Sequence, residues 1–289
     1  MVEYKVIEKP NILKRDAEAH KGTFGVSLLF CGSEGFAGAA VLAAKGCLRS
    51  GVGIAKLAVP DKIYPICAAN TPEAVFLPLK SDRKGKFGRI NKKHLTREIL
   101  KADSILIGCG IGVSENNQKL MEFLIDNACC PLIIDADGIN LLALNINILK
   151  RAKTPIILTP HPAEMSRLCG NSVSEIQQNR EAVAKNFATK HKVYLVLKGH
   201  KTVVATPDGD VFINPTGNAG MATGGSGDVL SGICAAMTGR SQDIAQSVKA
   251  AVYIHGAAGD LAAEKLSQTA MLPSDIIEEL PCVFKTLEG

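Results

Sequence analysis

The chain alternates short apolar runs with longer stretches in which apolar residues recur every three or four positions. Short runs are typical of buried strands, and the longer spacing is typical of helices. The pattern predicts strands at 25–31, 54–59, 104–107, 132–134, 155–158 and 193–197. It predicts helices at 39–49, around 120–125, and at 139–144, 174–191, 229–237, 245–264 and 274–280. Strands that alternate with helices favour an α/β fold with a parallel sheet.

The order changes once, where residues 203–205 and 211–213 flank a turn of Pro207, Asp208, Gly209 and Asp210 and predict a β-hairpin. We find no internal repeat, low-complexity segment or linker. Residues 1–289 are therefore expected to form a single domain, with the polar residues before Lys21 lying over its surface.

Residues 214–230 contain five glycines between a predicted strand and a predicted helix. Glycine suits positions where the backbone takes positive φ or approaches a ligand, and the free N–H groups at a helix start bind anions. The stretch therefore predicts a phosphate site. Asp228 lies where the helix begins, so we expect its carboxylate to be ionised and able to take a proton from a nearby hydroxyl. The alternative is that Asp228 only caps the helix.

Other polar or glycine-rich turns follow the ends of the predicted strands. In an open α/β sheet this edge binds ligands. The rule would gather Gly32, Ser33, residues 108–112, Asp135, Asp137, His161, residues 198–202 and the 217–228 loop.

Four of these side chains have a functional and a plainer interpretation. The functional interpretation of Asp135 and Asp137 is that they are general bases or magnesium-associated groups. The plainer interpretation is that they cap helices and keep strand ends soluble. His161, between two prolines, is a pre-oriented contact or a hydrogen-bonded loop histidine. Lys198 meets a phosphate or is a solvated loop lysine.

Two familiar nucleotide-binding motifs are excluded. Residues 108–112 look like a dinucleotide fingerprint, but Val113 stands where the third glycine is required. Residues 199–202 are not a Walker motif, because the glycine and the lysine are not adjacent and the preceding glycine is absent.

Composition narrows the function further. The formal charge is +5, aromatic residues make up 4% of the chain and there is no Trp, which argues against a nucleic-acid binder. The nine cysteines are odd in number and form no CxxC pair, which indicates reduced, buried thiols in a cytoplasmic protein. The N-terminus has no secretory pattern and no apolar run is long enough to cross a bilayer.

Taken together, several motifs closely resemble the ADP-dependent (S)-NAD(P)H-hydrate dehydratases of the ribokinase-like superfamily. The motifs are residues 20–25, Gly32-Ser33 together with residues 38–40, residues 135–137 together with Asn140, residues 159–162 together with Glu164, residues 198–202 and residues 217–228. The resemblance implies a three-layer α/β/α fold around a mainly parallel sheet. It also implies a lyase that repairs hydrated NADH and NADPH: the ring hydroxyl is phosphorylated and phosphate is then eliminated. The cofactors would be Mg²⁺ and a phosphoryl donor, ADP or ATP.

The resemblance also assigns roles to residues. Asp228 would be the base on the substrate hydroxyl, and the backbone from 222 to 227 would stabilise the transferring phosphoryl group. The phosphate loop would comprise Asn218, Thr223, Gly224, Gly225, Ser226 and Gly227. The adenine nucleotide would contact Gly227 with Lys198, Gly199, His200, Lys201 and Thr202, and the hydrated dinucleotide would contact Asp228 with Ala39, Gly110 and His161. No dense carboxylate cage is visible, so Mg²⁺ would bind through the phosphates and water.

Further expectations follow from the resemblance. Relatives form homotetramers. The family usually has proline where this chain has Cys109, and alanine where it has Gly138. The chain would carry no epimerase domain, so the R epimer would need a separate protein. Two alternatives stay open: a small-molecule kinase of the same superfamily, of the thiazole or pyridoxal type, and a nucleotide-binding sensor without turnover.

Overall fold

The computed structural model describes residues 2–12, 14–241 and 243–288. Within these ranges ten strands form one sheet in the order β1-β10-β9-β8-β7-β6-β5-β2-β3-β4. Neighbouring strands are parallel, except that β9 is antiparallel to both β8 and β10. The predicted parallel sheet and the predicted hairpin are both confirmed. The strands are β1 (Lys5–Val6), β2 (Val26–Phe30), β3 (Ile54–Pro60), β4 (Val75–Leu79), β5 (Ser104–Ile107), β6 (Leu132–Ile134), β7 (Ile156–Leu158), β8 (Tyr194–Leu197), β9 (Val203–Ala205) and β10 (Val211–Ile213).

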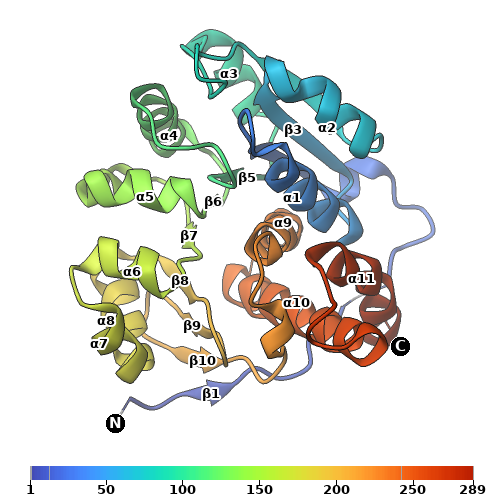
Figure 1. Cartoon of the computed structure of the whole chain (residues 1–289), viewed down its shortest axis with the longest axis vertical. Helices are drawn as coiled ribbons and strands as arrows, with labels where there is room; N and C mark the ends of the chain where they lie inside the picture. Colours follow the sequence, from blue (N-terminus) through green and yellow to red (C-terminus); the bar gives the residue numbers. More distant parts are fainter. Residues whose placement is uncertain (1, 13, 242, 289) are drawn as a thin grey trace.

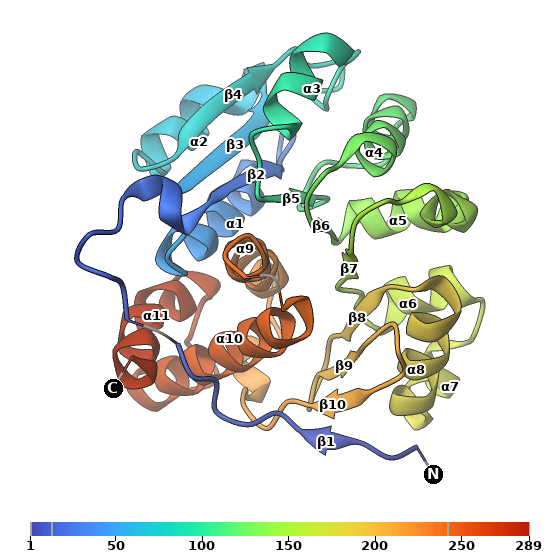
Figure 2. The same cartoon turned by 180° about the vertical axis from the view of Figure 1, so that it is seen from behind.

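Helices cover both faces of the sheet (Figures 1 and 2). One layer contains α1 (Ala37–Arg49), α2 (Tyr64–Asn70), α9 (Ser226–Thr238), α10 (Ile244–Leu266) and α11 (Pro273–Leu287). The other contains α3 (Lys92–Ile99), α4 (Glu115–Asn127), α5 (Asp137–Leu144), α6 (Pro162–Cys169), α7 (Val173–Gln178) and α8 (Arg180–His191). Short 3-10 helices occupy Lys21–Phe24, Asp61–Ile63, Ile146–Arg151 and Ala219–Met221.

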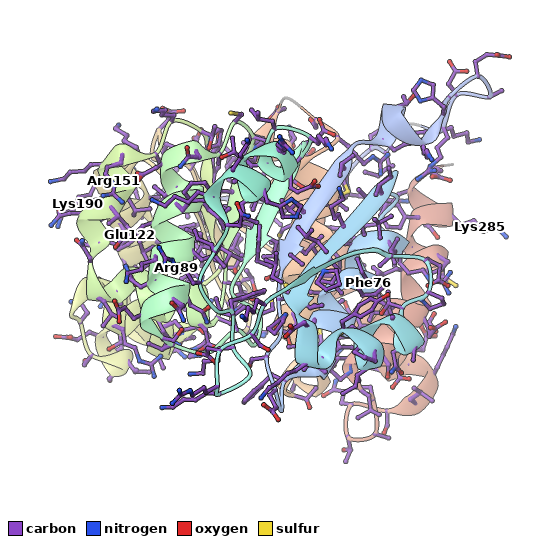
Figure 3. The ribbon with its side chains drawn as sticks, turned by 90° about the horizontal axis from the view of Figure 1, so that it is seen from above. Phe76, Arg89, Glu122, Arg151, Lys190 and Lys285 are labelled. Carbon is purple, nitrogen blue, oxygen red and sulfur yellow. The ribbon has the colours of Figure 1, made fainter. Side chains whose placement is uncertain are left out.

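The view from above shows the two helical layers on opposite sides of the strands (Figure 3). Leu29 packs in the core under the first layer, whereas Leu28 and Phe30 pack under the second. This alternation follows because successive residues of a strand point to opposite faces of the sheet. The three-layer α/β/α arrangement is therefore confirmed. Arg151 and Glu122, labelled on the outside of the second layer, form an exposed ion pair of 3.9 Å.

Some elements differ from the predictions. The predicted helix at 174–191 is two helices, α7 and α8, which break at Asn179. Helix α6 was not predicted, because its Thr-Pro-His-Pro start looks like a rigid turn; Pro162 is tolerated as the first helical residue, whose N–H has no partner in any case. Strand β4 was also missed. It contains Pro78, which it accommodates because it lies at the edge of the sheet.

The N-terminal segment is more ordered than predicted. Residues Lys5 and Val6 form the outermost strand, β1, which pairs with β10, and Ile7 is buried. The expectation that the residues before Lys21 lie over the surface holds for β1, whose two residues are exposed, and is wrong for Ile7. Six of the nine cysteines are buried, as their apolar surroundings predicted. Across the three described ranges, no helix has the length and apolarity needed to span a membrane.

The turns that follow the parallel strands meet at one edge of the sheet. Backbone hydrogen bonds continue the sheet beyond the strand ends: Gly32 N–H donates to Cys109 O at 2.8 Å, and Lys198 N–H donates to Pro160 O at 2.9 Å. Asp135 N–H donates to Ile107 O at 3.1 Å. These bonds join residues that lie 28 to 77 positions apart in the chain and bring the turns to one edge, as the strand-end rule predicted.

Candidate active site

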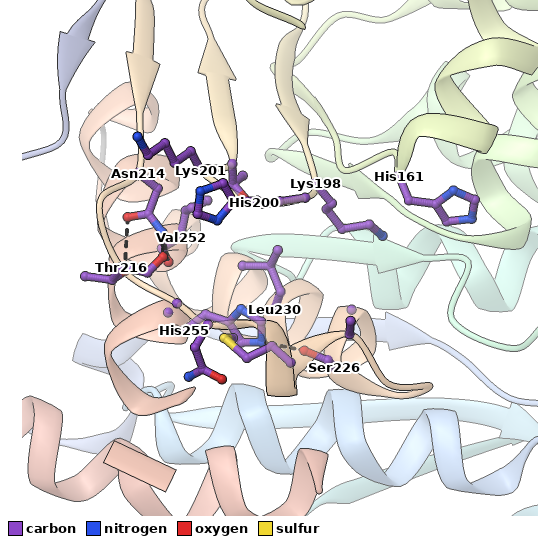
Figure 4. A pocket seen from close by; sticks show the side chains of 18 of the residues that line it. His161, Lys198, His200, Lys201, Asn214, Thr216, Ser226, Leu230, Val252 and His255 are labelled. Atoms are coloured by element: carbon purple, nitrogen blue, oxygen red, sulfur yellow. Dashed lines mark hydrogen bonds between the residues drawn. The ribbon is translucent and has the colours of Figure 1, made fainter. Parts of the chain in front are cut away.

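A cavity of about 700 Å³ lies at this edge of the sheet (Figure 4). Its walls come from the 198–202 turn, the loop between β10 and α9, the first residues of α9, and one side of α10, with His161 at one end. The volume suits a small-molecule ligand. The predicted nucleotide-binding residues Lys198, Gly199, His200, Lys201, Thr202 and Gly227 all line it.

The glycine-rich loop leaves the start of α9 open. The residue before α9 is Gly225, whose φ of 102° lies in the left-handed region that glycine tolerates, and it offers no capping side chain. The first N–H groups of α9 therefore have no cap and can bind an anion. Asp228 lies inside the first turn of α9 and not at the capping position. The interpretation of Asp228 as only a helix cap is therefore wrong.

The predicted phosphate-loop residues have different roles in the structure. Asn218, Thr223, Ser226 and Gly227 line the cavity, whereas Gly224 and Gly225 are not among its walls. The side-chain amide of Asn218 donates to Gly259 O at 2.9 Å and to Asp260 Oδ1 at 3.0 Å. Asn218 thus ties the loop to α10, so that the loop is held in place over the cavity.

A buried ion pair lies against the cavity. Lys198 Nζ is 2.7 Å from Asp135 Oδ1 and 3.8 Å from Glu164 Oε2. Burial opposes the charge on Lys198, but the two carboxylates outweigh it and raise the Lys198 pKa above its usual value. Burial likewise opposes the charge on Asp135, but Lys198 and the Ser231 hydroxyl, which donates to Asp135 Oδ2 at 2.7 Å, leave the Asp135 pKa lowered. Lys198 is therefore a fixed positive charge and not a solvated loop lysine.

Asp228 lies beside this pair. Carboxylate oxygens of Asp228 and Asp135 and the Sγ atom of Cys109 are all within 4.8 Å of one another. Burial, followed by the negative charge of Asp135, raises the pKa of Asp228 to about 7. The helix start alone does not keep this carboxyl group fully ionised at neutral pH, because it favours an anion by only roughly 0.3–1 kcal/mol. A pKa close to the working pH suits a general base.

His161 has two roles. It is the N-cap of α6: its Nδ1 accepts hydrogen bonds from the N–H groups of Ala163 at 3.1 Å and Glu164 at 3.3 Å. Burial and the nearby charge of Lys198 lower the pKa of His161, which favours a neutral ring. Because Nδ1 accepts, the proton of the neutral ring is on Nε2. His161 also lines the cavity, so the helix cap holds it in a fixed orientation toward a ligand.

The remaining predicted substrate contacts lie together outside the cavity wall. Gly110 has a φ of 66°, and a methyl group at this position would lie 2.9 Å from Ala39 Cβ. Ser33 Oγ donates to Gly110 O at 2.7 Å and holds the turn. Ala39 and Gly110 are therefore close to each other. Gly110 directly follows Cys109, whose Sγ atom lies within 4.8 Å of an Asp228 carboxylate oxygen.

The described residues do not fit Mg²⁺ as direct ligands. The group that comes nearest to a metal site is Cys109, Asp135 and Asp228. Mg²⁺ prefers oxygen ligands and avoids thiols, and Asp135 is already paired with Lys198.

Three residues of the site were missed from the sequence: Cys109 was noted only as a departure from a family pattern, and Ser231 and His255 were not singled out. His255 lines the cavity, with Nε2 3.4 Å from Ser226 Oγ, and burial lowers its pKa to about 4. Ser231 and His255 are isolated polar residues in otherwise apolar stretches of α9 and α10. That isolation was the available signal.

Comparison with known proteins relates this geometry to a family. The sequence profile described as NAD(P)H-hydrate dehydratase matches residues 27–282. The chain is 39% identical over 275 residues to the bifunctional NAD(P)H-hydrate repair enzyme Nnr of Moorella thermoacetica, covering 95% of this chain and 52% of that protein. It is 37% identical over 275 residues to the ADP-dependent (S)-NAD(P)H-hydrate dehydratase of Bacillus subtilis, covering 95% of this chain and 94% of that protein. The chain thus spans about half the length of its bifunctional relative.

Solved structures agree. The ADP/ATP-dependent NAD(P)H-hydrate dehydratase of Bacillus subtilis, co-crystallised with ATP and Mg²⁺, aligns with a TM-score of 0.82 and 34% identity, covering 96% of this chain and 95% of that chain. Ribokinase from Thermotoga maritima aligns at 0.54 with 16% identity, covering 90% and 99%, which indicates a shared fold alone and confirms the ribokinase-like architecture. With a family profile matching most of its length and relatives above 30% identity, this chain belongs to the NAD(P)H-hydrate dehydratase family.

Proposed function

We propose that this protein dehydrates the S epimer of hydrated NADH and NADPH, with an adenine nucleotide as phosphoryl donor. The observation that carries the proposal is the position of Asp228. It lies in the first turn of α9, beside the glycine loop and next to the buried charge of Lys198. A carboxylate with a pKa of about 7 can accept a proton at neutral pH. Membership of the dehydratase family supplies the substrate class.

The chemistry needs a better leaving group than hydroxide. Asp228 takes the proton of the ring hydroxyl while the hydroxyl oxygen forms a bond to the terminal phosphorus of the nucleotide. The bond between that phosphorus and the bridging oxygen of the nucleotide breaks at the same time. The ring C–O bond then breaks, and phosphate leaves with the electron pair of that bond. The neighbouring carbon gives its proton to solvent water, and the electron pair of its C–H bond forms the new double bond. The double bond of the reduced nicotinamide is restored. This is phosphoryl transfer followed by elimination.

The chain's residues divide these tasks. Free N–H groups at the start of α9 stabilise charge on the transferring phosphoryl group, and Lys198 supplies a fixed positive charge nearby. The 198–202 turn and Gly227 hold the nucleotide in the cavity, and Ala39, Gly110 and His161 contact the hydrated dinucleotide. Mg²⁺, bound to the nucleotide phosphates and water, would neutralise part of their charge.

The Bacillus subtilis relative is described as ADP-dependent and as ADP/ATP-dependent. We propose ADP as the usual donor here. The single domain and the cytoplasmic location remain expectations that come from the sequence pattern and the cysteines. The homotetramer and the separate protein for the R epimer remain expectations that come from the resemblance.

The test is an absorbance assay. Purified S-hydrate of NADH is mixed with the protein, Mg²⁺ and either ADP or ATP, and recovery of the near-ultraviolet band of reduced nicotinamide is followed. We expect the band to recover, and a comparison of the reactions with ADP and with ATP identifies the phosphoryl donor. The matched control, Asp228→Asn, should bind ADP with unchanged affinity and show no recovery.

Two results would favour the alternatives. A stable phosphorylated product without recovered NADH would indicate a small-molecule kinase. Nucleotide binding without any turnover, even in the parent protein, would indicate a sensor.

A further inference from the structure

Asp135 is the most deeply buried charge of the site, and the proposed mechanism gives it no task. Its side chain is 1% exposed at the end of β6. Oδ1 accepts from Lys198 Nζ at 2.7 Å, and Oδ2 accepts from Ser231 Oγ at 2.7 Å and from Cys109 Sγ at 3.8 Å. Donors from the turns after β5 and β8 and from α9 therefore surround it. A proton on either oxygen would displace one of these donors, so Asp135 stays ionised and is a poor proton acceptor.

Asp228 has a different environment a short distance away. The ionisable groups that face it are Cys109 after β5, Asp135 after β6, Asp137 on α5 and Lys198 after β8. The oxygens of Asp135 and Asp228 lie within 4.8 Å of each other. Lys198 is shared between Asp135 and Glu164, and no ion pair joins it to Asp228 among the described residues. Asp228 thus has a fixed negative neighbour, and the nearest positive charge is held by other carboxylates.

We propose that Asp135 is a positioning residue: its permanent negative charge holds the Lys198 ammonium against the phosphate loop and keeps Asp228 a proton acceptor of sufficient strength. The two carboxylates have different roles, since Asp135 stays charged while Asp228 accepts and releases the proton. The proton of the ring hydroxyl goes to Asp228 and not to Asp135, whose oxygens already accept hydrogen bonds. The kinetic test of this inference rests on the proposed function, whereas a second test measures folding stability and does not depend on that function.

The geometry explains why Asp135 can both hold Lys198 and act on Asp228. Asp135 N–H bonds to Ile107 O, so the backbone of Asp135 extends the sheet and its side chain has a fixed origin. From there Oδ1 reaches Lys198, while Oδ2 lies toward α9, where Ser231 is three residues beyond Asp228 and therefore on the same side of the helix. The Ser231 hydrogen bond holds Oδ2 near Asp228.

The kinetic test is the pH profile of kcat/KM for Asp135→Asn, which keeps the side-chain size and removes the charge. In the parent, kcat/KM should fall about tenfold for each pH unit below about 7. In the variant this acidic limb should move to lower pH by about one unit, because a like charge has been removed, and the dissociation constant of ADP should rise at least tenfold. Asp137→Asn is the matched control: Asp137 is a smaller cause of the raised Asp228 pKa, so a smaller displacement is expected.

A profile for Asp135→Asn that superimposes on the parental one after scaling would overturn the inference and leave Asp135 with a structural role only. A parent that shows no recovery of reduced nicotinamide would instead count against the proposed function.

The second test needs no turnover and covers the case in which Asp135→Asn leaves Lys198 unpaired and fails to fold. Asp135→Asn/Lys198→Met removes both charges of the buried pair together. At pH 8, Asp228→Asn should increase the folding equilibrium constant of the parent. In the double-variant background the same substitution should give a smaller increase, because Asp135 raises the pKa of Asp228 more than Lys198 lowers it. An equal or larger increase in the double-variant background would contradict the inference, because the charge of Asp135 would then not outweigh that of Lys198 at Asp228.

Discussion

Replacing the proposed base should make the protein more stable while it abolishes turnover. In Asp228→Asn an amide takes the place of a carboxyl group whose pKa rises from its usual value of 3.8 to about 7 on folding. Each tenfold step in an ionisation constant corresponds to about 1.4 kcal/mol, so ionised Asp228 costs the folded state about 4 kcal/mol. The amide carries no charge and avoids this cost.

The sign of the pH dependence follows from proton binding. Between pH 3.8 and about 7 the folded protein binds more protons at Asp228 than the unfolded chain does, so the free energy of unfolding falls as pH rises through this window. The gain from Asp228→Asn should therefore be about 2 kcal/mol at pH 5 and about 4 kcal/mol at pH 8.

Denaturant unfolding at the two pH values, at one protomer concentration, measures these gains. Glu73→Gln is the control, because Glu73 is exposed and its charge is already in water; a change within about 0.5 kcal/mol is expected. A variant no more stable than the parent at pH 8, or a gain that is equal at pH 5 and pH 8, would refute the reasoning.

Three further substitutions test the site. Lys198→Met should lower the free energy of unfolding by about 3–5 kcal/mol, because it leaves Asp135 buried and unpaired; denaturant unfolding measures this. Gly227→Ala should weaken ADP binding at least tenfold in calorimetry, since its methyl group would lie 3.3 Å from Lys198 Nζ where the nucleotide is expected. Gly110→Ala should raise the KM of the hydrated dinucleotide and leave that of ADP unchanged, because a φ of 66° and the contact with Ala39 both force the turn to move.

Each of these substitutions has a control or a contradicting result. Gly224→Ala, where a methyl group meets nothing within 4 Å, should affect ADP binding much less than Gly227→Ala. Equal losses in the two variants would remove the special role of Gly227. If Lys198→Met unfolds at the parental denaturant concentration, the ion pair contributes no net stability. A parallel rise in the KM of ADP for Gly110→Ala would mean that the turn serves both ligands.

The sequence alone was sufficient for every strand of the sheet except the two edge strands, β1 and β4, and for the edge that carries the site. Strands such as β5 and β6 are continuous apolar runs because parallel strands are covered on both faces, and runs of this kind can be recognised without tertiary information. The turns that follow these strands are not covered on both faces, and they contain glycines and polar residues in place of a continuous apolar run. The glycine loop before α9 was recognised for the same reason, and the motifs together identified the family.

Tertiary structure decided how the site works. The strand-end rule placed Asp135 and Lys198 at the same edge of the sheet, but it could not show that they form an ion pair or that Ser231 bonds to the same carboxylate. Nor could it give the pKa of Asp228: the local helix start favours the ionised carboxylate, but burial and the charge of Asp135 are stronger and come from residues distant in sequence. Local patterns determine secondary structure because its hydrogen bonds are local, whereas the charge state of a buried group depends on every neighbour that the fold brings near it.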